Sequence, residues 1–128
     1  YVLPRLKRAN GARIVLFSTV AVNTGMAFHS SIAAAKGGVE GFAKALAAEL
    51  AGQQIGVNVI APSLTQTPLA QGLLSTPEKI EASAKRHPLN RIGQAEDMAA
   101  LALFLLSDQA SWITGQVIGV DGGLSSLR

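Results

Sequence analysis

Few side chains in this sequence can move a proton near neutral pH. Its 128 residues include two histidines, one tyrosine and no cysteine. The histidines are His29 and His87, and the tyrosine is Tyr1. An imidazole, with an ordinary pKa of about 6.5, can act as an acid or a base. The lack of cysteine excludes thiolate nucleophiles, thiolate metal sites and disulfides, and it is compatible with the cytoplasm.

His29 is the more promising of the two imidazoles. On a helix it would share a face with Ile32, three residues later. Two interpretations stay open: His29 supplies a proton to a bound substrate, or it is an inert residue of a polar turn. The second is favoured because no carboxylate lies nearby in the sequence to orient the ring. His87 is interpreted as a loop residue.

Short apolar segments alternate with helical ones around these residues. Residues 14–17, 57–61 and 116–120 are brief apolar, β-branched runs, typical of strands buried on both faces of a parallel sheet. Residues 30–51 and 95–107 have helical patterns. The alternation predicts an α/β fold, a parallel sheet of three strands with flanking helices.

The two long helices carry specific expectations. Within 30–51, the ion pairs expected at i,i+4 spacing join Lys36, Glu40 and Lys44. Residues 98–106 are apolar all round, so this helix should be deeply buried. The residues expected to form the apolar stripe of the first helix are Ala35, Val39, Phe42, Leu46 and Leu50.

The segment from 63 to 91 is long, polar and rich in turns. Ser75 and Glu78 have the spacing of a capping box, so a helix is predicted to begin there. Residues 69–87 are interpreted as a lid or substrate loop. They carry no chemistry that identifies a substrate.

Charge and hydropathy exclude two classes of partner. The net charge is +3, and four basic residues precede residue 14. A nucleic-acid-binding face has a longer basic stripe, so no nucleic acid is expected. The longest apolar run has nine residues, short of the ~20 that span a bilayer, so no membrane partner is expected.

Five blocks resemble, in order and spacing, the C-terminal half of the short-chain dehydrogenase/reductase family. Each block alone is weak evidence, but five blocks that match in the same order and spacing indicate the family. The blocks are residues 11–15 with 18–19, residues 33–39, residues 57–62, residues 88–93 with 96–97, and residues 113–116 with 120–123.

This resemblance implies a doubly wound, Rossmann-type parallel sheet that binds NAD or NADP at the carboxyl ends of its strands. Residues 1–128 would form the C-terminal portion of one such domain. No GxGxxG or GxxxGxG segment occurs, so the N-terminal dinucleotide-binding half is absent from the sequence. The residue that selects NAD or NADP would lie in that half.

The resemblance also implies catalytic roles. Lys36 matches the lysine of the family's YxxxK helix, which holds the nicotinamide ribose and lowers the pKa of the tyrosine. Thr19 matches the hydroxyl residue that orients the substrate carbonyl for hydride transfer. The tyrosine position is Ile32, which has no acid or base, and Tyr1 lies at the wrong end of the chain. The proton would then come from His29, water or the substrate itself.

The loop after the second predicted strand matches the family's Pro-Gly turn. Pro62, Ser63, Thr65 and Thr67 occupy the stretch that holds the nicotinamide amide in the family. Ser63 replaces the glycine, and this disfavours a positive φ. A cofactor-facing role and a plain turn are equally compatible with these residues.

Two functions stay open. The resemblance implies an oxidoreductase that transfers a hydride between NAD or NADP and a small-molecule carbonyl or alcohol substrate. The alternative is a non-catalytic relative that serves as a cofactor-binding or oligomeric scaffold protein. Family members are commonly homodimers or homotetramers, and the residues expected in an interface or in the core are Ala47, Ala48, Ala51, Met98 and Trp112.

Overall fold

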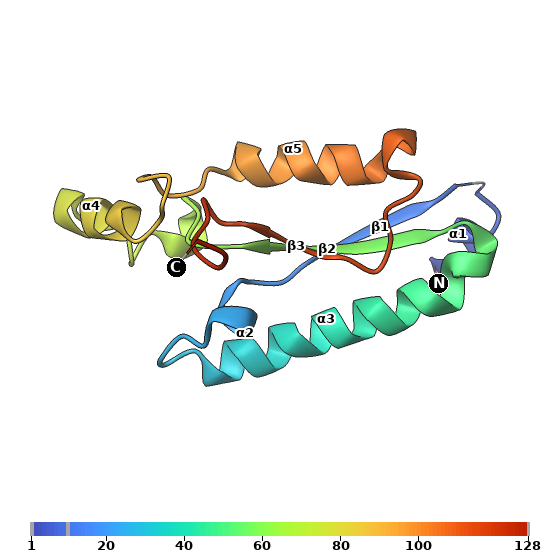
Figure 1. The fold of residues 1–128 in the computed structure, drawn as a ribbon, viewed down its shortest axis with the longest axis horizontal. Helices are drawn as coiled ribbons and strands as arrows, with labels where there is room; N and C mark the ends of the chain where they lie inside the picture. The colour runs from blue at the N-terminus through green and yellow to red at the C-terminus, as the bar shows by residue number, and fades with distance from the viewer. Residues whose placement is uncertain (1, 10, 128) are drawn as a thin grey trace.

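A three-stranded sheet lies between helices in the computed structural model, which describes residues 2–9 and 11–127 (Figure 1). Strands β1 (Arg13–Phe17), β2 (Gly56–Pro62) and β3 (Val117–Val120) run parallel, in the order β1-β2-β3. The predicted α/β class and its three strands are confirmed.

Two long helices cover opposite faces of this sheet (Figure 1). They are α3 (Ser30–Leu50) and α5 (Ala95–Leu106). Each follows one strand and precedes the next, as parallel crossovers require. The shorter elements are α1 (Leu3–Leu6), α2 (Ala21–Thr24), η1 (Ala51–Gln53), η2 (Pro68–Ala70), α4 (Pro77–Lys85) and η3 (Asp108–Ala110). Tyr1 lies outside the described residues.

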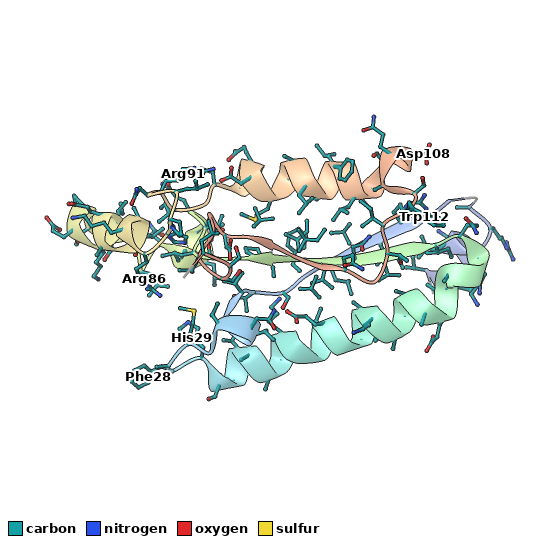
Figure 2. All side chains as sticks on the ribbon, viewed as in Figure 1. Phe28, His29, Arg86, Arg91, Asp108 and Trp112 are labelled. Carbon is teal, nitrogen blue, oxygen red and sulfur yellow. The ribbon has the colours of Figure 1, made fainter. Side chains whose placement is uncertain are left out.

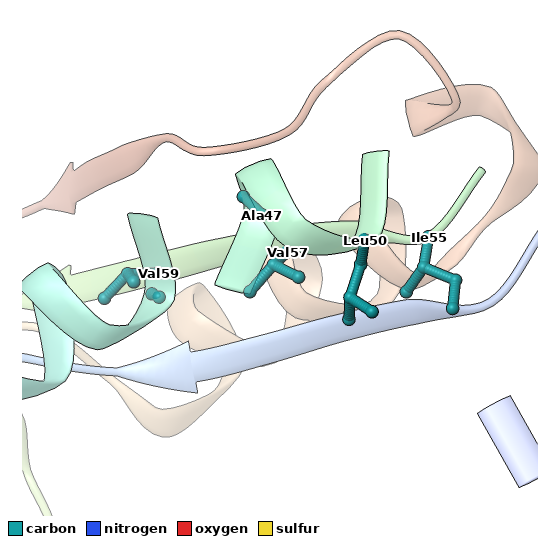
Figure 3. Close-up of a cluster of buried hydrophobic side chains, with 6 residues drawn as sticks. Ala47, Leu50, Ile55, Val57 and Val59 are labelled. Carbon is teal, nitrogen blue, oxygen red and sulfur yellow. The ribbon is translucent and has the colours of Figure 1, made fainter. Parts of the chain in front are cut away.

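The central strand β2 holds the core together. Val57 and Val59 face α3, where they pack with Leu50 and Ile55 (Figure 3). Ile60 faces α5 in a second cluster with Met98, Leu105 and Ala110. The strand is buried from both sides because it is the middle strand of a sheet covered on two faces.

One polar residue is buried within β2. The Asn58 side chain donates to the carbonyl of Ile113 at 2.9 Å and accepts from the backbone N–H of Gln116 at 3.1 Å. Both of its polar atoms are therefore paired, as burial demands. These bonds fasten the segment that leads into β3.

The buried face of α3 differs from the predicted stripe. Ala43 and Ala47 face the sheet, whereas Phe42 is 59% exposed and Ala35 is exposed. Small side chains let the helix lie close to the strands, and Ala43 takes the inner position that was predicted for Phe42. Val39, Leu46 and Leu50 stay on the inner side as predicted.

The predicted ion pairs along α3 are wrong. Among the described residues, salt bridges join Lys85 with Glu81 and Arg91 with Asp97. Glu40 instead accepts a 2.5 Å hydrogen bond from the buried Ser18 hydroxyl. That bond ties α3 to the end of β1.

Helix α5 is less buried than predicted. Leu105 is fully buried, but Leu103 is 71% exposed and Leu106 is also exposed. A single sheet face covers only one side of a helix, so the opposite side of this apolar segment is uncovered. Trp112 is 98% exposed, so it is not in the core; Ala47 and Met98 are core residues, whereas Ala48 and Ala51 are exposed.

The helix starts also differ in detail. The N-cap of α4 is Thr76, whose side chain accepts from the Lys79 N–H at 3.4 Å, and not Ser75. Proline at the following position fits the first helical turn. At α5, Gln94 and Asp97 form a reciprocal capping box.

Asp97 should make this protein sensitive to acid. Hydrogen bonds from Arg91 and from the Gln94 N–H lower its pKa from 3.8 to about 2. Because the folded-state pKa is the lower one, this stabilisation is complete above about pH 4 and is lost as the pH falls through about 2. In urea unfolding followed between these pH values, Asp97→Asn should lose less stability than the wild type. An equal decrease of the unfolding free energy with falling pH in the wild type and in Asp97→Asn would contradict this. Asp108 is exposed, so Asp108→Asn serves as the control and should behave as the wild type does.

Candidate active site

A cavity of about 730 Å³ opens where the carboxyl ends of β1 and β2 meet the start of α3. Thr19 reaches it from the turn after β1, and Pro62 from the end of β2. His29 and Ile32 line it from the first turn of α3. Parallel sheets bind their ligands at this edge of the strands. The structure therefore brings these four residues, all singled out from the sequence, to one place, whereas Lys36 is not among the residues that line the cavity.

Two hydrogen bonds hold the side chain of Thr19. Its hydroxyl donates to the carbonyl of Pro62 at 3.4 Å and accepts from the N–H of Ala21 at 3.3 Å. The neighbouring Ser18 points the other way, toward Glu40. Since successive side chains of an extended chain face opposite sides, only Thr19 can serve the cavity.

Lys36 lies one helical turn beyond Ile32. Its Nζ donates to the carbonyl of Phe17 at 3.0 Å, at the end of β1. An ammonium has three N–H donors, so this bond leaves two for hydroxyl groups such as those of a ribose. Lys36 does not pair with Glu40, so an ion pair along the helix does not explain the position of this lysine.

His29 occupies a strained turn. It is the N-cap residue of α3, and its Nδ1 lies 2.7 Å from the carbonyl of Ala27. Phe28, just before it, has a φ of 62° and is fully exposed. A bulky residue rarely adopts that conformation, so the surrounding turn must enforce it. Figure 2 shows His29 and Arg86, which both line the cavity, at the same end of the molecule.

The loop after β2 also borders the cavity. Pro62, Ser63, Thr65 and Thr67 all line it. Thr65 donates to the carbonyl of Ser63 at 3.1 Å, and Thr67 donates to that of Thr65 at 3.5 Å. Among the residues that the structure describes, the non-glycine residues with positive φ are Phe28, Gln54 and Asn90, so Ser63 keeps an ordinary backbone. The side-chain bonds make the loop a rigid wall whose polar groups can face a ligand.

Sequence reasoning missed the role of His87. It is only 3% exposed, although it lies in the turn after α4. Its Nε2 lies 2.9 Å from the Ser63 hydroxyl, and its Nδ1 lies 2.9 Å from the carbonyl of Ser83. Ser63 and His87 are 24 residues apart in the chain, and no repeat or motif in the sequence indicates that they meet.

A second cavity, of about 430 Å³, lies beside the first. Ser63 and His87 line both cavities. Asp121 lines the smaller one, and its carboxylate accepts from Ser125 and from the N–H of Gly123. Burial alone would raise the pKa of Asp121, but its hydrogen bonds with Ser125 and Gly123 hold it below its usual value.

The described residues contain no group of three or more metal-ligating side chains, and none of their helices is long and apolar enough to cross a bilayer. The donor set does suit a nicotinamide nucleotide. The Lys36 ammonium is bonded to the carbonyl of Phe17, a residue of the cavity wall, and keeps two further N–H donors, while Thr65 and Thr67 line the cavity and carry hydroxyl groups. Hydroxyl and amide groups of a cofactor need such partners.

Comparisons with known proteins agree with this geometry. A family model described as "Enoyl-(Acyl carrier protein) reductase" matches residues 1–125. A 3-oxoacyl-[acyl-carrier-protein] reductase of Thermotoga maritima is 44% identical over 120 residues, which make up 93% of this chain and 47% of that protein. The chain thus spans about half the length of the curated relatives it matches.

Two solved structures show what similar chains hold. The RhlG/NADP active-site complex of Pseudomonas aeruginosa has a TM-score of 0.89 and 34% identity, over 96% of this chain and 50% of that one. A 3-oxoacyl-[acyl-carrier protein] reductase of Brucella melitensis with bound NAD has a TM-score of 0.83 and 37% identity, over 96% of this chain and 44% of that one. Since the family model covers nearly the whole chain and these structures match its fold with TM-scores of 0.89 and 0.83, the chain belongs to the short-chain dehydrogenase/reductase family.

Proposed function

We propose that this chain is part of an oxidoreductase that transfers a hydride between NAD or NADP and a small-molecule carbonyl or alcohol substrate. The observation that carries the proposal is the placement of Thr19 and Lys36 at one edge of the sheet, beside a largely apolar cavity. Most of the relatives' printed names, reductases and dehydrogenases, favour this activity over a non-catalytic scaffold, although one relative that is 40% identical is named an inactive dehydrogenase.

Residues 1–128 would form the C-terminal portion of one Rossmann-type domain. The relatives are about twice as long as this chain, which supports a further half that binds the dinucleotide. The glycine-rich loop that cradles the pyrophosphate belongs to the first strand–helix unit of such folds. That half would also choose between NAD and NADP.

The chain's own residues would act as follows. The bound cofactor supplies or accepts the hydride. Lys36 holds the ribose with its free N–H groups, and the Pro62–Thr67 loop, with Ser63 and Thr65, lines the nicotinamide end. The Thr19 hydroxyl would turn from the carbonyl of Pro62, to which it donates at 3.4 Å, and donate to the substrate oxygen instead, which fixes the carbonyl for attack. His29 would be anchored by its Nδ1–H on the carbonyl of Ala27, and in its doubly protonated, imidazolium form it would give the proton on Nε2 to the substrate oxygen.

Lys36→Ala tests the proposal. Titration of the intact protein with NADPH and NADH should saturate for at least one of them, and the variant should bind that nucleotide about 10–100-fold more weakly, the worth of a lost charged hydrogen bond. Lys44→Ala, an exposed lysine of the same helix, should bind as the wild type does. The proposal fails if neither nucleotide saturates, and the role of Lys36 fails if its removal leaves the affinity unchanged.

A homodimer or homotetramer is part of the proposal. The outer side of α3 exposes Phe42, and the outer side of α5 exposes Leu103 and Leu106, close in the chain to the exposed Trp112. Large apolar side chains exposed on the outer sides of both helices would be covered in contacts between subunits. Sedimentation velocity of the intact protein measures the state. The cytoplasmic location expected from the sequence stays a prediction, which cell fractionation tests.

A further inference from the structure

One hydroxyl–imidazole pair forms the wall between the two cavities. Ser63 Oγ lies 2.9 Å from His87 Nε2, and His87 Nδ1 lies 2.9 Å from the carbonyl of Ser83. A carbonyl can only accept a hydrogen bond, so Nδ1 carries a proton and Nε2 accepts the proton of the Ser63 hydroxyl. This is the arrangement of an activated serine: a nucleophile, a base, and a third group that orients the base.

The surroundings favour the charged form that such a base must pass through. When Ser63 gives up its proton, the buried ring of His87 becomes an imidazolium. Asp121 lines the same small cavity, and its hydrogen bonds with Ser125 and Gly123 keep it ionised. A carboxylate beside the ring stabilises the positive charge.

The larger cavity offers room for an apolar group next to Ser63. Both Ser63 and His87 line it, so a ligand there can reach the hydroxyl. Within the described chain, the N–H of Leu64 makes no hydrogen bond. The N–H after a nucleophile is a usual donor to the oxyanion of acyl transfer. The apolar residues of the wall include Phe17, Val20, Met26, Leu69, Leu73 and Leu124.

We propose that Ser63 is an acyl-accepting nucleophile with His87 as its general base, acting on esters or thioesters that have an apolar acyl chain. Ser63 Oγ bonds to the acyl carbon while its proton passes to His87 Nε2. The bond to the leaving alcohol or thiol then breaks, and that group takes the proton from Nε2. Water repeats the sequence: it gives a proton to Nε2 and bonds to the acyl carbon, and the acid departs as Ser63 regains its proton. The reaction needs no redox partner and does not depend on the proposed hydride transfer.

The test uses the intact protein with an alkyl fluorophosphonate and with 4-nitrophenyl hexanoate. Mass spectrometry should find one phosphonyl adduct, on Ser63, and the ester should release nitrophenolate. Ser63→Ala should abolish both. Ser126→Ala is the matched control, because Ser126 also lines the smaller cavity and should not be needed. His87→Gln should slow labelling at least about 100-fold, the usual share of a general base.

Added imidazole distinguishes a base from a structural support. It should restore part of the labelling rate in His87→Ala, which a merely structural role of the ring would not allow. Circular dichroism checks that each variant is folded. If a His87 variant unfolds, the test rests on the labelling rates of the two serines in the wild-type protein. An adduct on Ser63 that forms well before any on Ser126 supports the proposal. No adduct on Ser63, or equal rates at both serines, overturns it.

Discussion

Replacing Ile32 with tyrosine should raise the rate of NAD(P)H-dependent carbonyl reduction by about 100–10,000-fold, the usual contribution of a general acid. This corresponds to about 3–5 kcal/mol of transition-state stabilisation. Initial rates of the intact protein with a panel of aryl aldehydes and ketones measure it. The effect is expected to fall on kcat rather than on nucleotide affinity, because Lys36 and the loop after β2 are unchanged.

The physical reason lies in the positions of three side chains. Ile32 lines the cavity together with Thr19, and Lys36 follows on the same helix face one turn later. The ammonium of Lys36 lies 3.0 Å from the carbonyl of Phe17, which also lines the cavity. A phenol at position 32 would therefore stand beside a positive charge, which lowers its pKa toward the working range.

Ile32→Phe is the matched control for Ile32→Tyr. It adds the same ring without the hydroxyl, so any gain from altered packing appears in both variants. A gain in Ile32→Tyr alone assigns the effect to proton transfer. Equal rates in the two variants, with nucleotide binding intact, would show that Thr19 and Lys36 do not border a hydride-transfer centre. If the wild type already turns over, its loss in His29→Gln identifies His29 as the present donor.

The strands and their order of appearance could be predicted because burial on both faces leaves a visible pattern. Residues 57–61 are continuously apolar except for Asn58, and β2 lies where a strand covered by α3 and α5 must lie. Thr19 and Pro62 were singled out by the family resemblance, and they lie together because parallel strands bring their carboxyl ends to one edge of the sheet.

Other features had no local signal. Ala43 rather than Phe42 faces the sheet, because close packing of a helix selects small residues over large ones at the contact. The bond between Ser63 and His87 depends on the path of the loop through η2 and α4, which the spacing of turn residues does not specify. The exposure of α5 depends on what covers its outer side, and hydropathy alone does not distinguish a core from an interface.

Leu105→Ala should destabilise the protein by about 2–5 kcal/mol, the range for a buried leucine truncated to alanine. Leu105 is fully buried and packs in one cluster with Ile60, Met98 and Ala110. Ile60 belongs to the middle strand and cannot move without disturbing both neighbouring strands, so the cavity left by the missing atoms should collapse little. Urea unfolding followed by circular dichroism measures the change.

Leu103→Ala, two residues earlier on the same helix, is the matched control. It makes the same change in helix propensity at an exposed position, so only the effect of burial differs between the two variants. Leu103 is 71% exposed, so its truncation should change the stability by less than about 0.5 kcal/mol in a monomer. A loss at Leu103 that grows with protein concentration would place the outer side of α5 in a subunit contact. If Leu105→Ala costs no more than Leu103→Ala at every concentration, then α5 does not pack on β2, and the position assigned to the whole wall around Met98 and Ser63 is wrong.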